Sequence, residues 1–195
     1  MYKLILSFIC ISLLGCSKPA PQKKKSEKVA IADRVSRECA QALCKRYDLV
    51  QSGEGGRMMY EIEGLFLSFD THRQLTKDEA RAMLIDCAHE VITTVNHNPE
   101  IQKYLLPGGF NEKSVQIQIF ITPDYKDNYY PDLGVCSYNY GKLAFSTYDR
   151  DNKYNYKTDD IETYQEAIAL LEIPSILEEF NYASAIIRNV ANKGL

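Results

Sequence analysis

The sequence lacks the short motifs by which metal sites and hydrolases are usually found. It contains no Cys-x-x-Cys pair, no Gly-x-Ser-x-Gly and no His-Glu-x-x-His. Its three histidines, His72, His89 and His97, do not show metal-ligand spacing. Residues 149–160 begin like a calcium loop, but Tyr154 stands at the position that requires glycine. We therefore expect no metal ion and no cofactor, and the motifs do not favour an enzyme.

Long apolar runs are equally scarce, because the one extended run is residues 4–14 near the N-terminus. Its 11 residues are too few to cross a bilayer as a helix, which needs about 20. Lys3 precedes the run, and Gly15 and Cys16 follow it directly. The rest of the sequence has no second apolar span, so we predict that no other part of the chain crosses a membrane.

The segment Leu13-Leu14-Gly15-Cys16 resembles the lipobox of bacterial lipoproteins. The resemblance covers only the first ~20 residues. It implies that a signal peptidase removes residues 1–15, and that Cys16 becomes an acylated N-terminus held firmly in a membrane. Ser17 follows the cysteine where aspartate would retain the protein at the inner membrane. The resemblance therefore implies the outer membrane, with the domain in the periplasm or at the cell surface. An ordinary secretory signal and an uncleaved anchor are the alternatives.

Charge is distributed unevenly along the chain. Residues 16–30 carry five lysines and one glutamate, which predicts a basic, flexible tether. Residues 31–195 carry 17 basic and 25 acidic residues, a net charge of −8. An acidic domain argues against nucleic acid as a partner, because phosphate contacts need clustered lysine and arginine. The lysines of the tether either face anionic lipid headgroups or belong to a solvated linker.

The hydrophobic pattern predicts a single α+β domain over residues 31–195, in the order α-β-α-β-β-β-α-α. We expect a mostly antiparallel sheet of about four strands with helices packed on one face. The glycine-rich segment 51–56 is expected to be a loop. Strands are predicted at 57–69, 115–122, 133–140 and 142–148, and helices at 31–50, 77–97, 99–106, 160–171 and 175–193. The first two strands become parallel if helix 77–97 forms a crossover between them.

Four cysteines remain in the predicted domain: Cys39, Cys44, Cys87 and Cys136. Cys39 and Cys44 are poorly placed to pair with each other on one helix. An even number of cysteines outside the cytoplasm permits disulfides, so one interpretation is a disulfide from this helix to Cys87 or Cys136. Buried free thiols are the other, and the sequence leaves the choice open.

The segment 123–157 contains eight of the fourteen tyrosines, interleaved with aspartate and asparagine. Tyrosine combines a large contact area with a polar tip, which suits binding surfaces, and rings beside amides and carboxylates suit sugar recognition. We predict a contact surface at Tyr129, Tyr130, Tyr154 and Tyr156. The alternative is that these tyrosines pair across strands or shield a sheet edge.

A second polar group lies on helix 77–97, opposite its apolar stripe. We interpret it as a solvated face, although carboxylate and imidazole together are also suited to acid–base chemistry. Its residues are Asp86, His89, Glu90, Thr93 and His97.

These patterns together predict a lipid-anchored envelope lipoprotein that acts by binding. The expected partner is an envelope protein or peptidoglycan, in addition to the membrane itself. The alternatives are a hydrolase acting on envelope polymers and a structural subunit of a secretion or envelope assembly.

Overall fold

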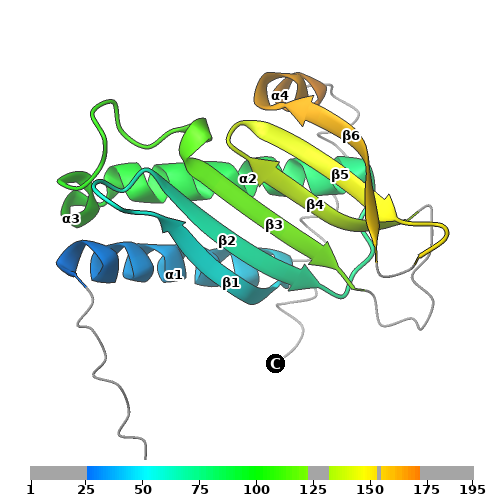
Figure 1. Ribbon diagram of the computed structural model, residues 1–195, viewed down its shortest axis with the longest axis horizontal. Coiled ribbons are helices and arrows are strands. Elements are labelled where there is room, and N and C mark those ends of the chain that lie inside the picture. Colours follow the sequence, from blue (N-terminus) through cyan, green and yellow to red (C-terminus); the bar gives the residue numbers. More distant parts are fainter. Residues whose placement is uncertain (1–25, 123–131, 153–154, 172–195) are drawn as a thin grey trace, which may run out of the picture.

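The computed structural model describes residues 26–122, 132–152 and 155–171 (Figure 1). Over these residues the protein is α+β, with a six-stranded mixed sheet in the order β1-β2-β3-β4-β5-β6. The fold class is confirmed, and the expected number of about four strands is wrong. The elements are α1 (Glu27–Tyr47), β1 (Val50–Arg57), β2 (Gly64–Thr71), α2 (Lys77–His97), α3 (Pro99–Gln102), the 3₁₀ turn η1 (Glu112–Ser114), β3 (Val115–Ile121), β4 (Leu133–Asn139), β5 (Lys142–Tyr148), β6 (Tyr156–Thr163) and α4 (Tyr164–Leu171).

The first helix begins and ends earlier than predicted. Ser26 caps α1 by accepting a hydrogen bond from the backbone N–H of Val29, so residues 27–30 are helical rather than part of a tether. Asp48 ends the helix in the left-handed conformation, with φ of 55°. Val50 therefore opens β1 instead of closing the helix.

The glycine-rich segment 51–56 is a strand, so its prediction as a loop was wrong. It pairs antiparallel with β2, from Val50 opposite Asp70 to Arg57 opposite Gly64. A Cβ built on Gly56 would lie 2.5 Å from the carbonyl oxygen of Gly64. Glycine at this position permits a close approach of two strands. The sequence alone does not distinguish such a glycine from one in a turn.

The helix α2 is the element that the sequence predicts best. Thr76 and Glu79 form the predicted capping box, with both hydrogen bonds present. Asn98 follows the helix as predicted, and α3 after it is shorter than the expected 99–106. Because α2 crosses over between β2 and β3, these two strands are parallel, as the crossover alternative predicted.

The later strands form an antiparallel meander. The two-residue turn of Tyr140 and Gly141 joins β4 to β5, and both residues have positive φ, as this hairpin type requires. The prediction of a helix over 160–171 was wrong in its first turn, because residues 160–163 belong to β6. In β6 Ile161 is 63% exposed, so it is not the buried helical position that its spacing suggested.

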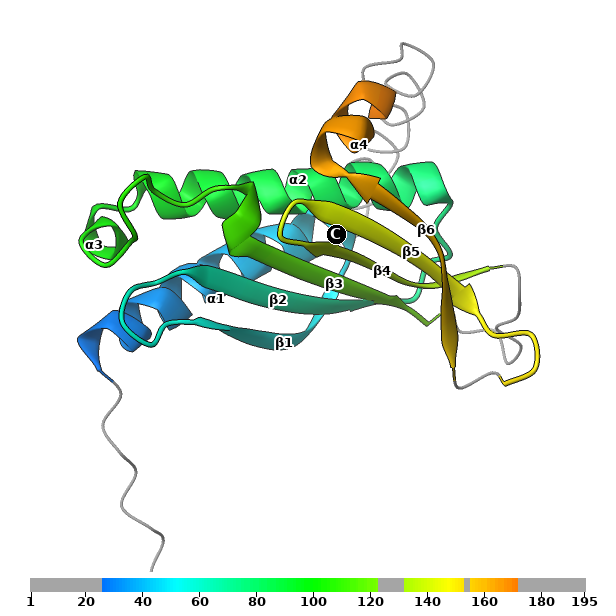
Figure 2. The same cartoon turned by 45° about the horizontal axis from the view of Figure 1, so that its top comes forward.

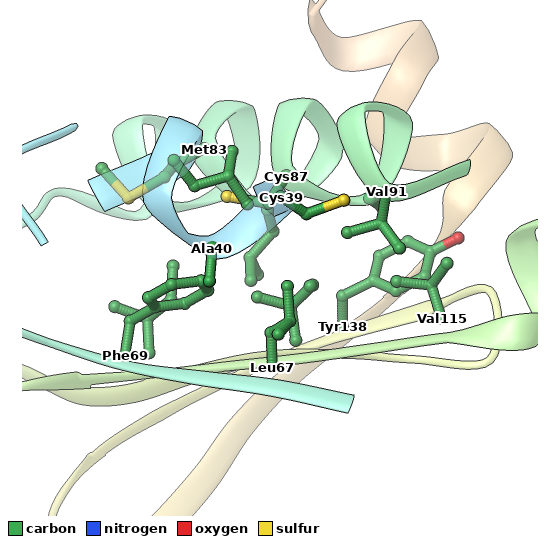
Figure 3. Close-up of a cluster of buried hydrophobic side chains, with 14 of the residues drawn as sticks. Cys39, Ala40, Leu67, Phe69, Met83, Cys87, Val91, Val115 and Tyr138 are labelled. Carbon is green, nitrogen blue, oxygen red and sulfur yellow. The ribbon is translucent and has the colours of Figure 1, made fainter. Parts of the chain in front are cut away.

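The core lies between the sheet and the helices α1 and α2, which run side by side in opposite directions across one face of the sheet (Figure 2). Alternate residues of β3, beginning with Val115, are fully buried. Figure 3 shows Met83 and Cys87 on the side of α2 that faces the sheet, and Val91 above Tyr138 and Val115. Burial of each such side chain contributes roughly 1.5–3 kcal/mol.

The cysteines of the predicted domain are free thiols, so the disulfide alternative is wrong. Cys39, Cys87 and Cys136 are buried in the core, and Cys44 is partly exposed. Within the three described stretches of the chain, no helix is long and apolar enough to cross a membrane.

Candidate functional site

A cavity of about 440 Å³ opens at the end of the sheet where α2 begins, which we call the Thr76 end. The opposite end, where the chain enters α1, is the Ser26 end (Figure 1). Apolar side chains of Leu75, Leu133 and Phe145 contribute to the lining of the cavity. Its polar lining comes from Gln74, Lys77, Asp132, Thr147, Asp159 and Asp160.

The cavity is formed where several elements end or begin together. Thr76 starts α2 at this end, so the positive pole of the helix faces the cavity. The start of β4, the end of β5 and the first half of β6 supply the other walls. Asp132 and the adjacent pair Asp159 and Asp160 therefore come from two parts of the chain, and they meet only in the fold.

A buried ion pair fixes β6 to α2 beside the cavity. Arg81 donates from Nε and Nη2 to the two carboxylate oxygens of Glu162, both at 2.7 Å. These side chains are only 4% and 9% exposed. The hydrogen bonds from Arg81 hold the pKa of the Glu162 carboxyl below its usual value of 4.5. Because each side chain binds the charged group of the other, we assign this pair a structural role.

Lys77 connects the same pair to the cavity wall. Its ammonium lies 2.7 Å from Glu162 and also pairs with Asp160. It stands 5.1 Å from the centroid of the Phe145 ring, so it covers that ring from the cavity side. The face of the Phe145 ring is thus in contact with the ammonium group of Lys77.

The polar lining favours a ligand that donates hydrogen bonds. Asp159 accepts from the backbone N–H of Thr147 at 3.2 Å and also from its hydroxyl. Three aspartates and one lysine line the cavity, which leaves it acidic. A carboxylate is an acceptor only, so ammonium, amide and hydroxyl groups are its natural partners.

Tyr156 is the one predicted contact residue within the described stretches. It is 43% exposed and pairs across the strands with Tyr148, with ring centroids 5.3 Å apart. The buried Tyr148 donates its hydroxyl to the carbonyl of Ile121 at 2.7 Å. A Cβ on Gly134 would lie 2.5 Å from Tyr156, so the glycine makes room for this pair. The cross-strand alternative thus holds for Tyr156.

The predicted contact residues Tyr129, Tyr130 and Tyr154 lie outside the described residues. The neighbours that flank them in sequence, such as Asp132 and Asn155, are at the Thr76 end. Their role in a contact surface stays a prediction.

The polar face of α2 does not lie wholly in solvent, so its interpretation as a solvated face is corrected. Asp86 and Glu90 accept hydrogen bonds from Arg46 of α1 at 2.5 and 2.6 Å, and Tyr47 donates to Asp86 at 2.8 Å. These carboxylates join the two helices. His89 of the same face is exposed.

Burial keeps the core cysteines in the thiol form. It raises the pKa of Cys39 to about 11 and that of Cys136 to about 12, and it also raises the pKa of Cys87. A protonated thiol is a weak nucleophile, so these residues are structural. Across residues 26–122, 132–152 and 155–171, no group of histidine, cysteine and carboxylate side chains is arranged to hold a metal ion.

No protein-family model, curated protein or solved structure matches the chain significantly.

Proposed function

We propose that this protein is a lipid-anchored envelope lipoprotein of a bacterium, acylated at Cys16, whose domain is a binding module. Its partner is peptidoglycan or an envelope protein, which it meets through the cavity at the Thr76 end. The outer membrane is the proposed location, because serine and not aspartate follows Cys16.

The proposal rests on one observation: the residue at which the chain enters α1 and the cavity lie at opposite ends of the domain. The chain enters at Ser26, while the cavity opens where α2 begins, at the other end of the sheet (Figure 1). The 21 residues of α2 span about 30 Å between these ends. An anchor at Cys16 would therefore leave the cavity accessible from the side away from the lipid.

The chemistry of the cavity supports a partner with nitrogen and hydroxyl donors. Peptidoglycan offers sugar hydroxyls, amides and free amino groups, and a basic protein segment offers ammonium and guanidinium groups. Both suit the three aspartates, because a hydrogen bond to an ionised carboxylate is about twice as strong as one between two neutral groups.

The test is site-specific photo-crosslinking of the full-length chain in living cells. We expect a photoreactive residue at Gln74, on the cavity wall, to capture one specific partner. Gln41 is the matched control, because it is exposed on α1 away from the cavity. An adduct that a muramidase shortens identifies peptidoglycan, and one that resists it identifies a protein. Equal adducts from both positions, or none from Gln74, would contradict the proposal.

A second variant relates the capture to the acidic lining. Asp132 is exposed at the mouth of the cavity, so Asp132→Asn removes one negative charge without disturbing the core. We expect weaker capture at Gln74 in this variant. Unchanged capture would show that binding of the partner does not depend on the Asp132 carboxylate.

A further inference from the structure

The loop between β1 and β2 presents two large apolar side chains to solvent at the Ser26 end. Met59 is 81% exposed and Tyr60 is 79% exposed. Among the residues that the structure describes, no other large apolar side chain is as exposed; Ile161, the next, is at 63%. Exposed apolar groups of this size usually mark a contact surface.

The loop is held in place by hydrogen bonds on both sides. Lys28, in the first turn of α1, donates its ammonium to the carbonyls of Met59 and Tyr60 at 3.2 and 2.5 Å. Ile62, buried to 1% exposure, donates its N–H to the carbonyl of Tyr104 at 2.7 Å. The backbone is thus fixed while the two side chains point away from the core.

A third apolar side chain lies in the neighbouring segment. Leu106 is 45% exposed, and its neighbour Leu105 forms a parallel bridge with Ile62. We call Met59, Tyr60 and Leu106 the apolar tip. It combines two aliphatic side chains with a tyrosine, whose ring is apolar and whose hydroxyl prefers water, a combination suited to a membrane–water interface.

The entry of the chain indicates what covers the apolar tip. Ser26 caps the same helix whose Lys28 holds the loop, and Cys16 is only ten positions earlier in the sequence. Ten residues reach at most about 35 Å when fully extended. Four lysines lie in that segment, and they favour a surface of anionic headgroups. A lipid-anchored Cys16 would therefore keep the apolar tip close to the bilayer.

We propose that the apolar tip is a membrane-contact surface, which docks on the bilayer that holds the lipid at Cys16. This inference rests on the proposed lipid anchor. Docking becomes an intramolecular step once the anchor is in place, so a small apolar area is sufficient. It orients the domain with the Ser26 end at the lipid and the Thr76 end away from it.

The absence of tryptophan makes a direct test available, because one introduced tryptophan is then the only one in the chain. The full lipidated protein carrying Tyr60→Trp is reconstituted into phosphatidylethanolamine–phosphatidylglycerol vesicles with brominated acyl chains. We expect emission to shift to the blue and to fall at least about twofold relative to unbrominated vesicles. The control is Arg150→Trp, at an exposed position of the Thr76 end, which we expect to be unaffected.

Two further outcomes separate this inference from the proposed function. Adding Met59→Ser and Leu106→Ser to the Tyr60→Trp protein should restore most of the emission, since the tip then loses its apolar area. If the protein floats with the vesicles but Tyr60→Trp is not quenched, the docking is overturned and the anchor stands. If the protein expressed in bacteria carries no lipid and does not float, the anchor itself is wrong.

Discussion

Each end of the domain contains an arginine–glutamate ion pair, one exposed and the other buried. At the Ser26 end, Arg34 and Glu100 form an ion pair at 2.8 Å with side chains 48% and 57% exposed. At the Thr76 end, Arg81 and Glu162 form a pair of similar length with side chains 4% and 9% exposed. Pairs of similar length thus carry very different energetic weight, because water screens the first pair and is largely excluded from the second.

The two most exposed apolar side chains lie at the Ser26 end. The Ser26 end exposes Met59 and Tyr60, whereas at the Thr76 end Leu75 and Leu133 are largely buried beneath a polar rim. The apolar tip lies on the loop between β1 and β2, whereas β4, β5 and β6 line the acidic cavity, so different strands of one sheet carry the two surfaces. The domain thus presents its most exposed apolar side chains and its acidic cavity at separate ends.

The comparison is tested most strongly by breaking the buried pair. Arg81→Ala leaves Glu162 buried without its partner, and we expect a loss of roughly 3–5 kcal/mol in the free energy of unfolding. Arg34→Ala, at the exposed pair, should cost less than about 1 kcal/mol. Urea denaturation of both variants measures the difference. Similar losses would mean that the two ends do not differ in solvent screening.

The packing of the Thr76 end is tested by Gly134→Ala. The added methyl would overlap the ring of Tyr156 and would lie tightly against that of Tyr148, so we expect a loss of about 1–3 kcal/mol. The same substitution in a Tyr156→Ala background should cost less, because the ring that it meets is gone. Gly53→Ala is the matched control, since its Cβ would make ordinary contacts. Additive effects in the double variant would contradict the overlap.

Acid should weaken the Thr76 end by protonating Glu162. The pKa of this group is lowered in the folded protein, so its contribution to stability is complete above its usual value of 4.5. The contribution is lost as the pH falls through the folded pKa. We expect a smaller effect than that of Arg81→Ala, because a neutral carboxyl still accepts a hydrogen bond. Urea midpoints at neutral pH and near pH 3 should differ less in Glu162→Gln than in the native chain.

The two helix starts should differ more modestly. Thr76→Ala removes one half of a complete capping box, and we expect a loss of about 1 kcal/mol. Ser26 caps α1 through a single 3.4 Å hydrogen bond in an exposed position, so Ser26→Ala should cost less. Thermal unfolding of the two variants compares them. A larger loss for Ser26→Ala would reverse this ranking of the ends.

The smallest effect is expected at the apolar tip. Met59→Ser with Tyr60→Ser should change the free energy of unfolding by no more than about 0.5 kcal/mol, because these side chains are exposed. A chemical denaturation curve in the absence of lipid measures this. A large loss would show that the two side chains support the core.

The sequence predicts an element well when one local signal dominates. Thr76, Glu79 and an apolar stripe establish α2, and strict alternation establishes β3. It predicts β1 and β6 poorly, because the first is rich in glycine and the second has mostly exposed polar residues. For α4, the hydrogen bonds between Thr163 and Glu166 reveal a second capping box, which would have placed its start correctly.

The candidate site was less accessible to sequence reasoning. In the sequence, Asp132 belongs to the tyrosine-rich segment 123–157, and Asp160 ends the segment 149–160 that begins like a calcium loop. Nothing in the sequence indicates that they meet, because their meeting depends on the pairing of three strands. The Arg81–Glu162 pair joins residues far apart in the chain, and no local pattern indicates it. The exposure of Met59 and Tyr60 is likewise evident only in the fold, where Lys28 of α1 binds the carbonyls of both residues.

The parallel pairing of β2 with β3 determines the order in which the sheet can assemble. Leu65 and Val115, which face each other, are about fifty positions apart, whereas the β4–β5 hairpin closes through two residues. Closing a long loop costs more chain entropy than closing a short one, and distant contacts slow folding. We expect the β1–β2 and β4–β5 hairpins to form early and the central pair last. Until α2 brings β3 beside β2, both strands keep an open edge, the state in which this chain is most prone to pair with another copy of itself.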